Sequence, residues 1–274
     1  MFEEILKNVA VKTPLVHCIT NYVTVNDCAN ILLACGASPI MADDAAEAEE
    51  ITSICSALDI NIGTLNRRTV ESMLLAGKKA NALSRPVVLD PVGAGASALR
   101  TDTAHELMKA IRFSVIRGNI SEIKTIAQGG GTTKGVDADG NDAVTEENLD
   151  KAVAFAKELS AKTGAVIAIT GAIDVVANAQ KAYAIRNGNR LMSKITGTGC
   201  MLTAVIAGFC GANPDNLLDA TAAAVCVMGL CGELAFDRLQ KTDGGTATYR
   251  TYLIDAMSKM NPEILNGGIK IESK

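Results

Sequence analysis

Residues 194–211 read KITGTGCMLTAVIAGFCG. The second half is apolar and contains no proline, which predicts a buried helix over residues 201–211. Gly197 and Gly199, just before it, allow a tight turn and the close approach of a ligand to the backbone. A glycine turn that enters a helix leaves unpaired N–H groups and the positive end of the helix dipole at one point. The stretch therefore predicts an anion site with Cys200 beside it.

Cys200 falls at the first turn of this helix, where the helix dipole favours the thiolate. The N–H groups around it could also hold a developing phosphoryl group or oxyanion. However, Gly-x-Gly before a helix is common, and a cysteine is often simply a small buried apolar residue. The anion-site interpretation therefore requires further ligand groups from elsewhere in the chain.

Composition places the chain among well-packed globular proteins. Hydrophobic residues make up 48% of the 274 residues and charged residues 20%, and no segment has the composition of a linker. We therefore expect a single domain over residues 1–274. The net charge of -4 and the absence of a Lys/Arg cluster argue against a nucleic-acid surface.

The first residues carry two acids and an amphipathic pattern, which predicts a docking helix and no signal peptide. Residues 195–214 are uncharged and about as long as a membrane span, but only about a dozen are continuously apolar. We therefore expect a buried helix there, no membrane partner and a cytoplasmic protein. The eight cysteines include no Cys-x-x-Cys pair, and with two histidines they predict reduced core residues rather than a zinc site.

Short apolar runs alternate with helical patterns along the first two thirds of the chain. Strands are predicted at residues 14–20, 38–42, 59–63, 86–89, 113–117 and 165–170, with a hairpin at 174–177 and 181–186. Helices are predicted at 27–35, 43–58, 67–83, 101–111, 121–127, 146–162, 201–211, 217–240 and 246–260, and a Gly-rich loop at 128–145. This order predicts an α/β fold with a mostly parallel central sheet and helices on both faces.

In such sheets ligands bind beyond the carboxyl ends of the strands. Asp90, Arg117 and Glu122 lie at or just beyond the ends of predicted strands and suit a phosphate chain with magnesium, because the metal takes carboxylate oxygens and arginine meets phosphate oxygens. The other residues at predicted strand ends are Thr20, Asn21, Met41, Gly63, Asn119, Thr170 and Gly171.

Three alternatives stay open on the residues alone. Gly93, Gly95 and Ala98 imitate a dinucleotide fingerprint, which would suit a nicotinamide-linked oxidoreductase, although the next strand ends in Arg117 and not in an acid. A thiol enzyme could use Cys200 as nucleophile and His17 as base. A ligand-binding protein without catalysis is the third.

Six motifs in order resemble the hydroxyethylthiazole kinases of thiamine salvage, within the ribokinase-like superfamily. They are VHCITN (16–21), SPIMA (38–42), NIGTL (61–65), VLDPVGAG (88–95), IRGNISEI (116–123) and ITGTGC (195–200). The resemblance extends from about residue 14 to residue 260. It implies ATP-dependent phosphorylation of the alcohol 4-methyl-5-(2-hydroxyethyl)thiazole, with hydroxymethylpyrimidine, the substrate of a sister family, as the alternative acceptor.

The resemblance also implies roles for single residues. Met41 and Gly197 would contact the thiazole. Asn21 and Gly63 would line its pocket, which neighbouring subunits of a homotrimer would share.

On the nucleotide side, the resemblance assigns Arg117 and Thr170 to ATP, and Asp90 and Glu122 to Mg²⁺, directly or through water. The wider superfamily usually has an aspartate at the position of Cys200. A thiol with an ordinary pKa of about 8.5 is a poorer base at neutral pH than a carboxylate. We therefore expect the anion hole and the metal to dominate catalysis, with Cys200 contributing less.

Overall fold

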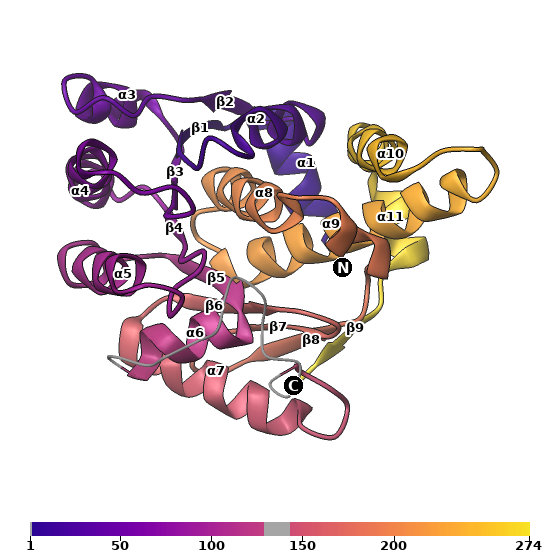
Figure 1. Cartoon of the computed structure of the whole chain (residues 1–274). Coiled ribbons are helices and arrows are strands. Elements are labelled where there is room, and N and C mark those ends of the chain that lie inside the picture. The colour runs from indigo at the N-terminus through magenta and orange to yellow at the C-terminus, as the bar shows by residue number, and fades with distance from the viewer. Residues whose placement is uncertain (1, 129–142) are drawn as a thin grey trace.

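The computed structural model describes residues 2–128 and 143–274. Within these residues one sheet of nine strands crosses the molecule in the order β2-β1-β3-β4-β5-β6-β7-β8-β9 (Figure 1). The strands are β1 (Leu15–Ile19), β2 (Ser38–Ile40), β3 (Ala57–Asn61), β4 (Val87–Asp90), β5 (Val115–Asn119), β6 (Val166–Thr170), β7 (Asp174–Ala177), β8 (Ala182–Ile185) and β9 (Ile271–Ser273). The first six run parallel and the last three pair antiparallel, so the predicted mostly parallel sheet is confirmed.

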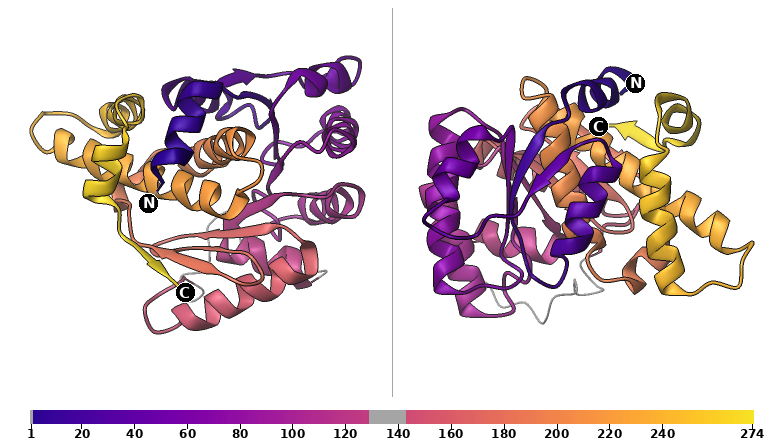
Figure 2. Two further views of the ribbon diagram at one scale, coloured as in Figure 1. Left: turned by 180° about the vertical axis from the view of Figure 1, so that it is seen from behind. Right: turned by 90° about the horizontal axis from the view of Figure 1, so that it is seen from above.

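Helices cover both faces of the sheet, as predicted (Figures 1 and 2). One face carries α3 (Ala48–Ile54), α4 (Arg67–Ala82), α5 (Ala98–Ala110), α6 (Ile120–Gln128) and α7 (Leu149–Thr163). The other carries α1 (Glu3–Lys12), α2 (Val25–Ala34), α8 (Thr198–Ala212), α9 (Leu217–Leu239), α10 (Thr246–Ser258) and α11 (Pro262–Gly268). The sheet therefore lies between two separate apolar cores, which explains why its strands read as nearly continuous apolar runs.

The two most apolar helices, α8 and α9, are core elements. Nearly every side chain of α8 from Met201 to Cys210 is buried, as predicted for this stretch. Helix α9 is long and apolar enough to cross a membrane by length and composition, with a mean hydropathy of 1.6, but 72% of that segment is buried inside the protein. Both helices pack on each other and on the sheet, which is the arrangement of a buried helical layer.

Some predicted boundaries were wrong. The helix predicted over residues 43–58 is only Ala48–Ile54, because Ala57 and Leu58 pair with Val16 and His17 of β1 and belong to the sheet. The strand predicted at 113–117 lies two residues later, at Val115–Asn119.

The C-terminal end holds two elements that were not predicted. Helix α11 is capped by Asn261, whose side chain accepts a hydrogen bond from the Ile264 N–H, and strand β9 extends the sheet by pairing with β8. The loop predicted at 128–145 falls mostly on residues 129–142, which lie outside the described residues.

Candidate active site

The glycine turn before α8 has the geometry of an anion site. Gly197 is the N-cap with a φ of +86°, and the Met201 N–H donates to the Gly197 carbonyl at 2.8 Å as the first helical hydrogen bond. Among residues 2–128 and 143–274, no acceptor engages the N–H groups of Thr198, Gly199 and Cys200. Three adjacent donors at the positive end of a helix dipole therefore remain available to an anion.

Neighbouring side chains lie so close to Gly197 and Gly199 that neither position has room for a Cβ. A Cβ at Gly197 would lie 2.5 Å from Cγ2 of Thr24, and one at Gly199 would lie 2.5 Å from Nη1 of Arg117. Because contacts this short do not occur, a side chain at either position would displace its neighbour. The absence of a Cβ at Gly199 thus lets a guanidinium lie directly against the turn.

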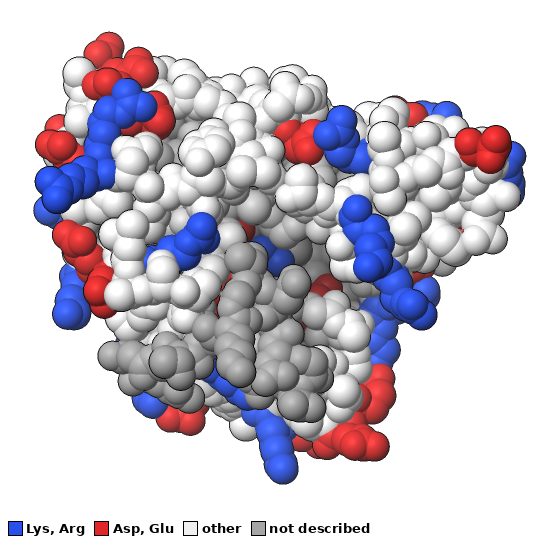
Figure 3. Space-filling model, in the orientation of Figure 1, with Lys and Arg blue, Asp and Glu red and all other residues white. Residues whose placement is uncertain are grey.

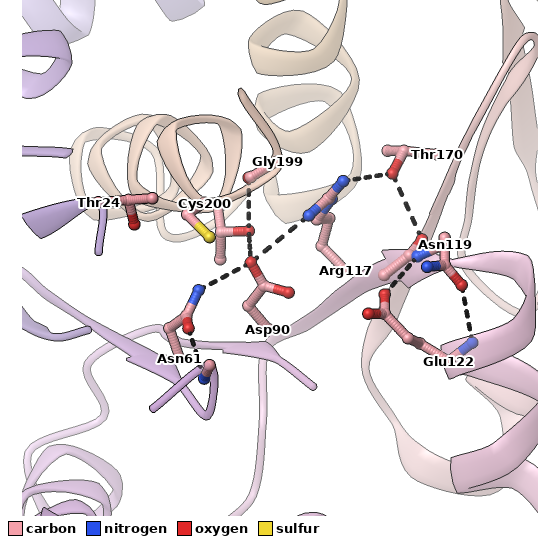
Figure 4. A network of polar contacts seen from close by, with 12 residues as sticks. Thr24, Asn61, Asp90, Arg117, Asn119, Glu122, Thr170, Gly199 and Cys200 are labelled. Carbon is pink, nitrogen blue, oxygen red and sulfur yellow. Dashed lines mark hydrogen bonds and ion pairs between the residues drawn. The ribbon is translucent and has the colours of Figure 1, made fainter. Parts of the chain in front are cut away.

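Arg117 joins this turn to the strand ends. Its Nη2 donates to Oγ1 of Thr170 at 2.6 Å, and its Nη1 lies 3.4 Å from Oδ2 of Asp90 (Figure 4). Arg117 was expected as the last residue of its strand, but it is the third residue of β5, since that strand runs to Asn119. The predicted ATP residues Arg117 and Thr170 are therefore in direct contact.

Asp90, at the end of β4, is fully buried and collects hydrogen bonds from three elements. Its Oδ2 accepts from Nδ2 of Asn61 at 3.0 Å and from Oγ1 of Thr203 at 2.9 Å, besides the contact with Arg117. Burial raises the pKa of Asp90, and these three partners oppose the rise. Its Oδ1 is buried without a partner in the described part of the chain.

Glu122 closes a capping box at the start of α6. Its Oε2 accepts from the Asn119 N–H at 2.8 Å, while the Glu122 N–H donates to Oδ1 of Asn119 at 2.9 Å. Its Oε1 accepts from the Gly93 N–H at 2.8 Å. Burial, followed by the charge of Asp90, raises the pKa of Glu122 to about 7.

The pair of Asp90 and Glu122 could hold a divalent cation. The unpartnered Oδ1 of Asp90 faces the side on which Glu122 lies (Figure 4), and each carboxylate oxygen of Glu122 uses one of its two lone pairs on an N–H. Two neighbouring carboxyls with raised pKa are stabilised in their charged form by a cation. No group of three or more His, Cys, Asp and Glu suited to a metal occurs in the described ranges, so phosphate oxygens and water would supply the remaining ligands of magnesium.

Asn21 contacts Cys200 and lies against Gly63. Nδ2 of Asn21 lies 3.2 Å from Sγ of Cys200 and 3.0 Å from Oδ1 of Asn61. A Cβ at Gly63 would lie 3.0 Å from Cβ and Nδ2 of Asn21, so this cluster also depends on a glycine. Burial, followed by the charge of Asp90, raises the pKa of Cys200. Met41 follows the edge strand β2 and packs against the core under α8 and α9.

A cavity of about 880 Å³ opens beside the glycine turn. Arg117 and Thr170 line one wall, residues 187–194 line another, and Thr198 and Gly199 lie between them. Figure 3 shows this face of the molecule hollowed near its centre, with charged atoms visible inside the hollow. Arg190 and Lys194 add positive charge to the lining, which suits a ligand that carries phosphate groups.

The structure argues against the dinucleotide alternative. The Gly93 N–H donates to Glu122, the Gly95 N–H donates to Oγ1 of Thr101, and the Ala96 N–H donates to the Gly93 carbonyl. These N–H groups are used within the protein and cannot cradle a pyrophosphate in the way that the fingerprint requires.

The thiol-enzyme alternative lacks its base. His17 is fully buried, with Nδ1 2.9 Å from Oγ1 of Thr52 and Nε2 2.7 Å from the Ala42 carbonyl. Its neighbours Val16 and Cys18 belong to the core under α8, so the alternation along β1 directs His17 to the opposite face of the sheet from Cys200. The eight cysteines, all at described positions, form no disulfide, as predicted.

Sequence reasoning missed three residues of this network: Thr24, Asn61 and Thr203. Asn61 lies in the strand two residues before Gly63, and Thr203 follows Cys200 by three residues, so both are on elements that had been predicted. Thr24 is the N-cap residue of α2, and its Oγ1 donates to Oδ1 of Asn21 rather than capping the helix. Polar residues near the ends of apolar elements were the available signal.

Comparison with solved structures defines the class. A ribokinase-like superfamily protein from Enterococcus faecalis superposes with a TM-score of 0.61 at 15% identity, over 93% of this chain and 88% of that one, and so shares the fold. The structure of the hydroxyethylthiazole kinase protein from Pyrococcus horikoshii superposes with a TM-score of 0.87 at 34% identity, over 100% and 98% of the two chains. Fold and site together define a kinase of the ribokinase-like class.

Sequence comparison gives the family within that class. The model of the hydroxyethylthiazole kinase family matches residues 6–263. A hydroxyethylthiazole kinase from Clostridium acetobutylicum is 62% identical over 273 residues, which is 100% of both chains, and one from Desulfovibrio desulfuricans is 52% identical over 95% of this chain and 94% of that one. The chain belongs to the hydroxyethylthiazole kinase family.

The contact between Gly197 and Thr24 yields a prediction about stability. Gly197→Ala places a side chain at positive φ and against a methyl group, and should lower the free energy of unfolding by about 2–4 kcal/mol. Thr24→Ser removes that methyl group, so alone it should destabilise by about 1 kcal/mol, whereas in the Gly197→Ala background it should recover the part of the loss that comes from the methyl contact and leave the cost of the positive φ. Urea unfolding of the four proteins measures both effects. Additive effects of the two substitutions would contradict the predicted contact.

Proposed function

We propose that this protein transfers the γ-phosphoryl group of ATP to the hydroxyl of 4-methyl-5-(2-hydroxyethyl)thiazole. The observation that carries the proposal is the set of three N–H groups at Thr198, Gly199 and Cys200 that have no acceptor in the described part of the chain, with the Arg117 guanidinium against the turn. Donors and a cation fixed in this way stabilise the charge of a transferring phosphoryl group without reorganisation. The names of the relatives support the choice of the thiazole alcohol over hydroxymethylpyrimidine.

ATP fits the cavity beside the glycine turn. Arg117 and Thr170, at the inner wall, would bind its phosphates, and the N–H groups from Gly197 to Cys200 would hold the γ-phosphoryl group. Asp90 and Glu122 would hold Mg²⁺, directly or through water. When bound, the metal neutralises charge on the phosphate oxygens.

The acceptor alcohol would lie on the Cys200 side of the turn. Gly197 and Met41 would contact the thiazole ring, and Asn21 and Gly63 would form the wall behind it. The alcohol oxygen forms a bond to the γ-phosphorus as the bond from that phosphorus to the bridging oxygen of ADP breaks. The hydroxyl proton passes to the Cys200 sulfur or to water. Proximity to the held phosphoryl group supplies more of the rate than the thiol does, because burial disfavours the thiolate.

We infer a homotrimer whose neighbouring subunits complete each substrate pocket, with the chain acting as one domain in the cytoplasm and with no nucleic-acid or membrane partner. Tyr22 and Val23, which directly follow Asn21, support the shared pocket because they are 77% and 59% exposed. Large apolar side chains beside a site are typical of a surface that a partner covers.

The test of the proposal is ADP release by the purified protein with ATP, Mg²⁺ and either alcohol. We expect release that depends on the thiazole alcohol, with a kcat/KM at least about a hundredfold above that for hydroxymethylpyrimidine, since the pocket must be shaped to one ring. ³¹P NMR of the product would identify the phosphate ester. Equal rates with both alcohols, or with neither present, would contradict the assigned substrate.

Two variants separate the metal from the thiol. Glu122→Gln should raise the Mg²⁺ concentration for half-maximal activity by about tenfold, because it removes one charged ligand. Cys200→Asp should keep or increase kcat, because the Asn21 N–H can donate to a carboxylate as well.

In the unmodified protein, the Mg²⁺ requirement should rise as the pH falls below about 7, where Glu122 takes up a proton that the metal must displace. Glu122→Gln should flatten this pH dependence. Complete loss of activity in Cys200→Asp would overturn the order of importance proposed here.

A further inference from the structure

The side chain of Asn21 is fully occupied by contacts inside the protein. Its Oδ1 accepts from the Thr24 N–H at 3.1 Å and from Oγ1 of Thr24 at 3.0 Å. Its Nδ2 donates to Oδ1 of Asn61 at 3.0 Å and lies 3.2 Å from Sγ of Cys200. A carboxamide has two donor hydrogens and two acceptor lone pairs, so none remains for a substrate.

The orientation of the Asn21 amide is determined by its partners. A backbone N–H can only donate, and therefore the atom that faces the Thr24 N–H must be the oxygen. The nitrogen is then directed to Cys200 and Asn61. Because Asn21 is buried, turning the amide over would leave several polar groups without partners.

The same reasoning fixes Asn61. Its Oδ1 accepts from the Gly63 N–H at 2.9 Å, so its Nδ2 is the atom that donates to Oδ2 of Asp90 at 3.0 Å. Asn61 is 1% exposed, and a Cβ on Gly63 would lie 2.9 Å from its Oδ1. The two amides thus donate in one direction, from Asn21 to Asn61 and from Asn61 to Asp90, and the second N–H of Asn21 is directed to Cys200. Figure 4 shows the contact between Asn61 and Asp90.

These two oriented amides determine that a hydrogen-bond donor, and not an acceptor, faces the Cys200 sulfur. The sulfur faces an N–H donor, so the S–H bond of the neutral thiol must point elsewhere and the sulfur is prepared to carry negative charge. An acceptor at the position of the Asn21 nitrogen would have the opposite effect, because it would hold the thiol proton.

We propose that Asn21 is a positioning residue that acts through Cys200, presenting an N–H to the sulfur so that the sulfur can accept the hydroxyl proton, and that Asn61 holds Asn21 in this orientation. The inference rests on the proposed function, because it assigns the alcohol as the proton donor. It differs from a role for Asn21 in binding the thiazole alcohol, since the amide has no remaining capacity for that contact.

The first measurement does not require catalysis. Iodoacetamide reacts with thiolates, so the alkylation rate of Cys200 at one fixed pH, followed by peptide mass spectrometry, reports how well the sulfur carries charge. Asn21→Asp keeps the oxygen that Thr24 contacts and removes the N–H, and it should slow alkylation of Cys200 by about tenfold or more. Cys35, which is also partly exposed, is the internal reference and should react at an unchanged rate.

Two further variants provide the controls. Asn21→Leu has a similar volume and no added charge, so a slower reaction there excludes simple repulsion by a new carboxylate. Asn213→Asp changes a buried asparagine at the other end of α8, whose Nδ2 donates to the Phe209 carbonyl. It should lower Tm and leave Cys200 alkylation and kinase activity unchanged.

Kinetics then separates positioning from substrate binding. Asn21→Asp should lower kcat by about tenfold with a KM for the thiazole alcohol within about twofold, and this loss should disappear in a Cys200→Ala background. Three results would overturn the inference. The first is a KM for the thiazole alcohol that rises in Asn21→Asp with kcat unchanged, and the second is an equal loss of kcat in the Cys200→Ala background. The third is unchanged alkylation of Cys200 in both Asn21 variants. The alkylation result stands even if the assigned alcohol is not the substrate, so the two failures can be distinguished.

Discussion

The site depends on how closely the arginine of β5 approaches the start of α8. Unpaired N–H groups and a guanidinium both carry positive charge, so together they favour an anion held beside them. The approach is possible because Gly199 has no Cβ, which would lie 2.5 Å from Nη1 of Arg117. In the absence of an anion, Asp90 supplies the nearest compensating charge.

Asp90 therefore connects the elements that form the site. Its carboxylate contacts Arg117 from β5, Asn61 from β3 and Thr203 from α8, so one buried acid connects these two strands with α8. Removing a single partner from such a buried network leaves an uncompensated charge, which is far more destabilising than the loss of a surface ion pair.

The sequence predicted the sheet, the two helical layers and the glycine turn because each depends on local pattern: apolar runs of strand length, helical spacing and glycine before an apolar helix. The sequence-based predictions were wrong where pairing between distant segments determines the secondary structure. Ala57 and Leu58 pair with β1, and the short strand β9 forms only by pairing with β8. The predictions named Asp90 and Arg117 but missed Asn61 and Thr203, because their role lies in contacts between distant segments. Asn119 and Glu122 were both named near a predicted strand end, but the capping box that joins them is visible only in the structure.

The central claim is that the N–H groups at the start of α8 hold the phosphoryl group in transfer. A crystal structure of the protein with ADP, aluminium fluoride, Mg²⁺ and the thiazole alcohol tests it most directly. The account predicts fluoride ligands within about 3 Å of the N–H groups of Gly199 and Cys200, with the alcohol oxygen in line on the Cys200 side. Aluminium fluoride bound away from the turn, with these N–H groups facing only solvent, would contradict it.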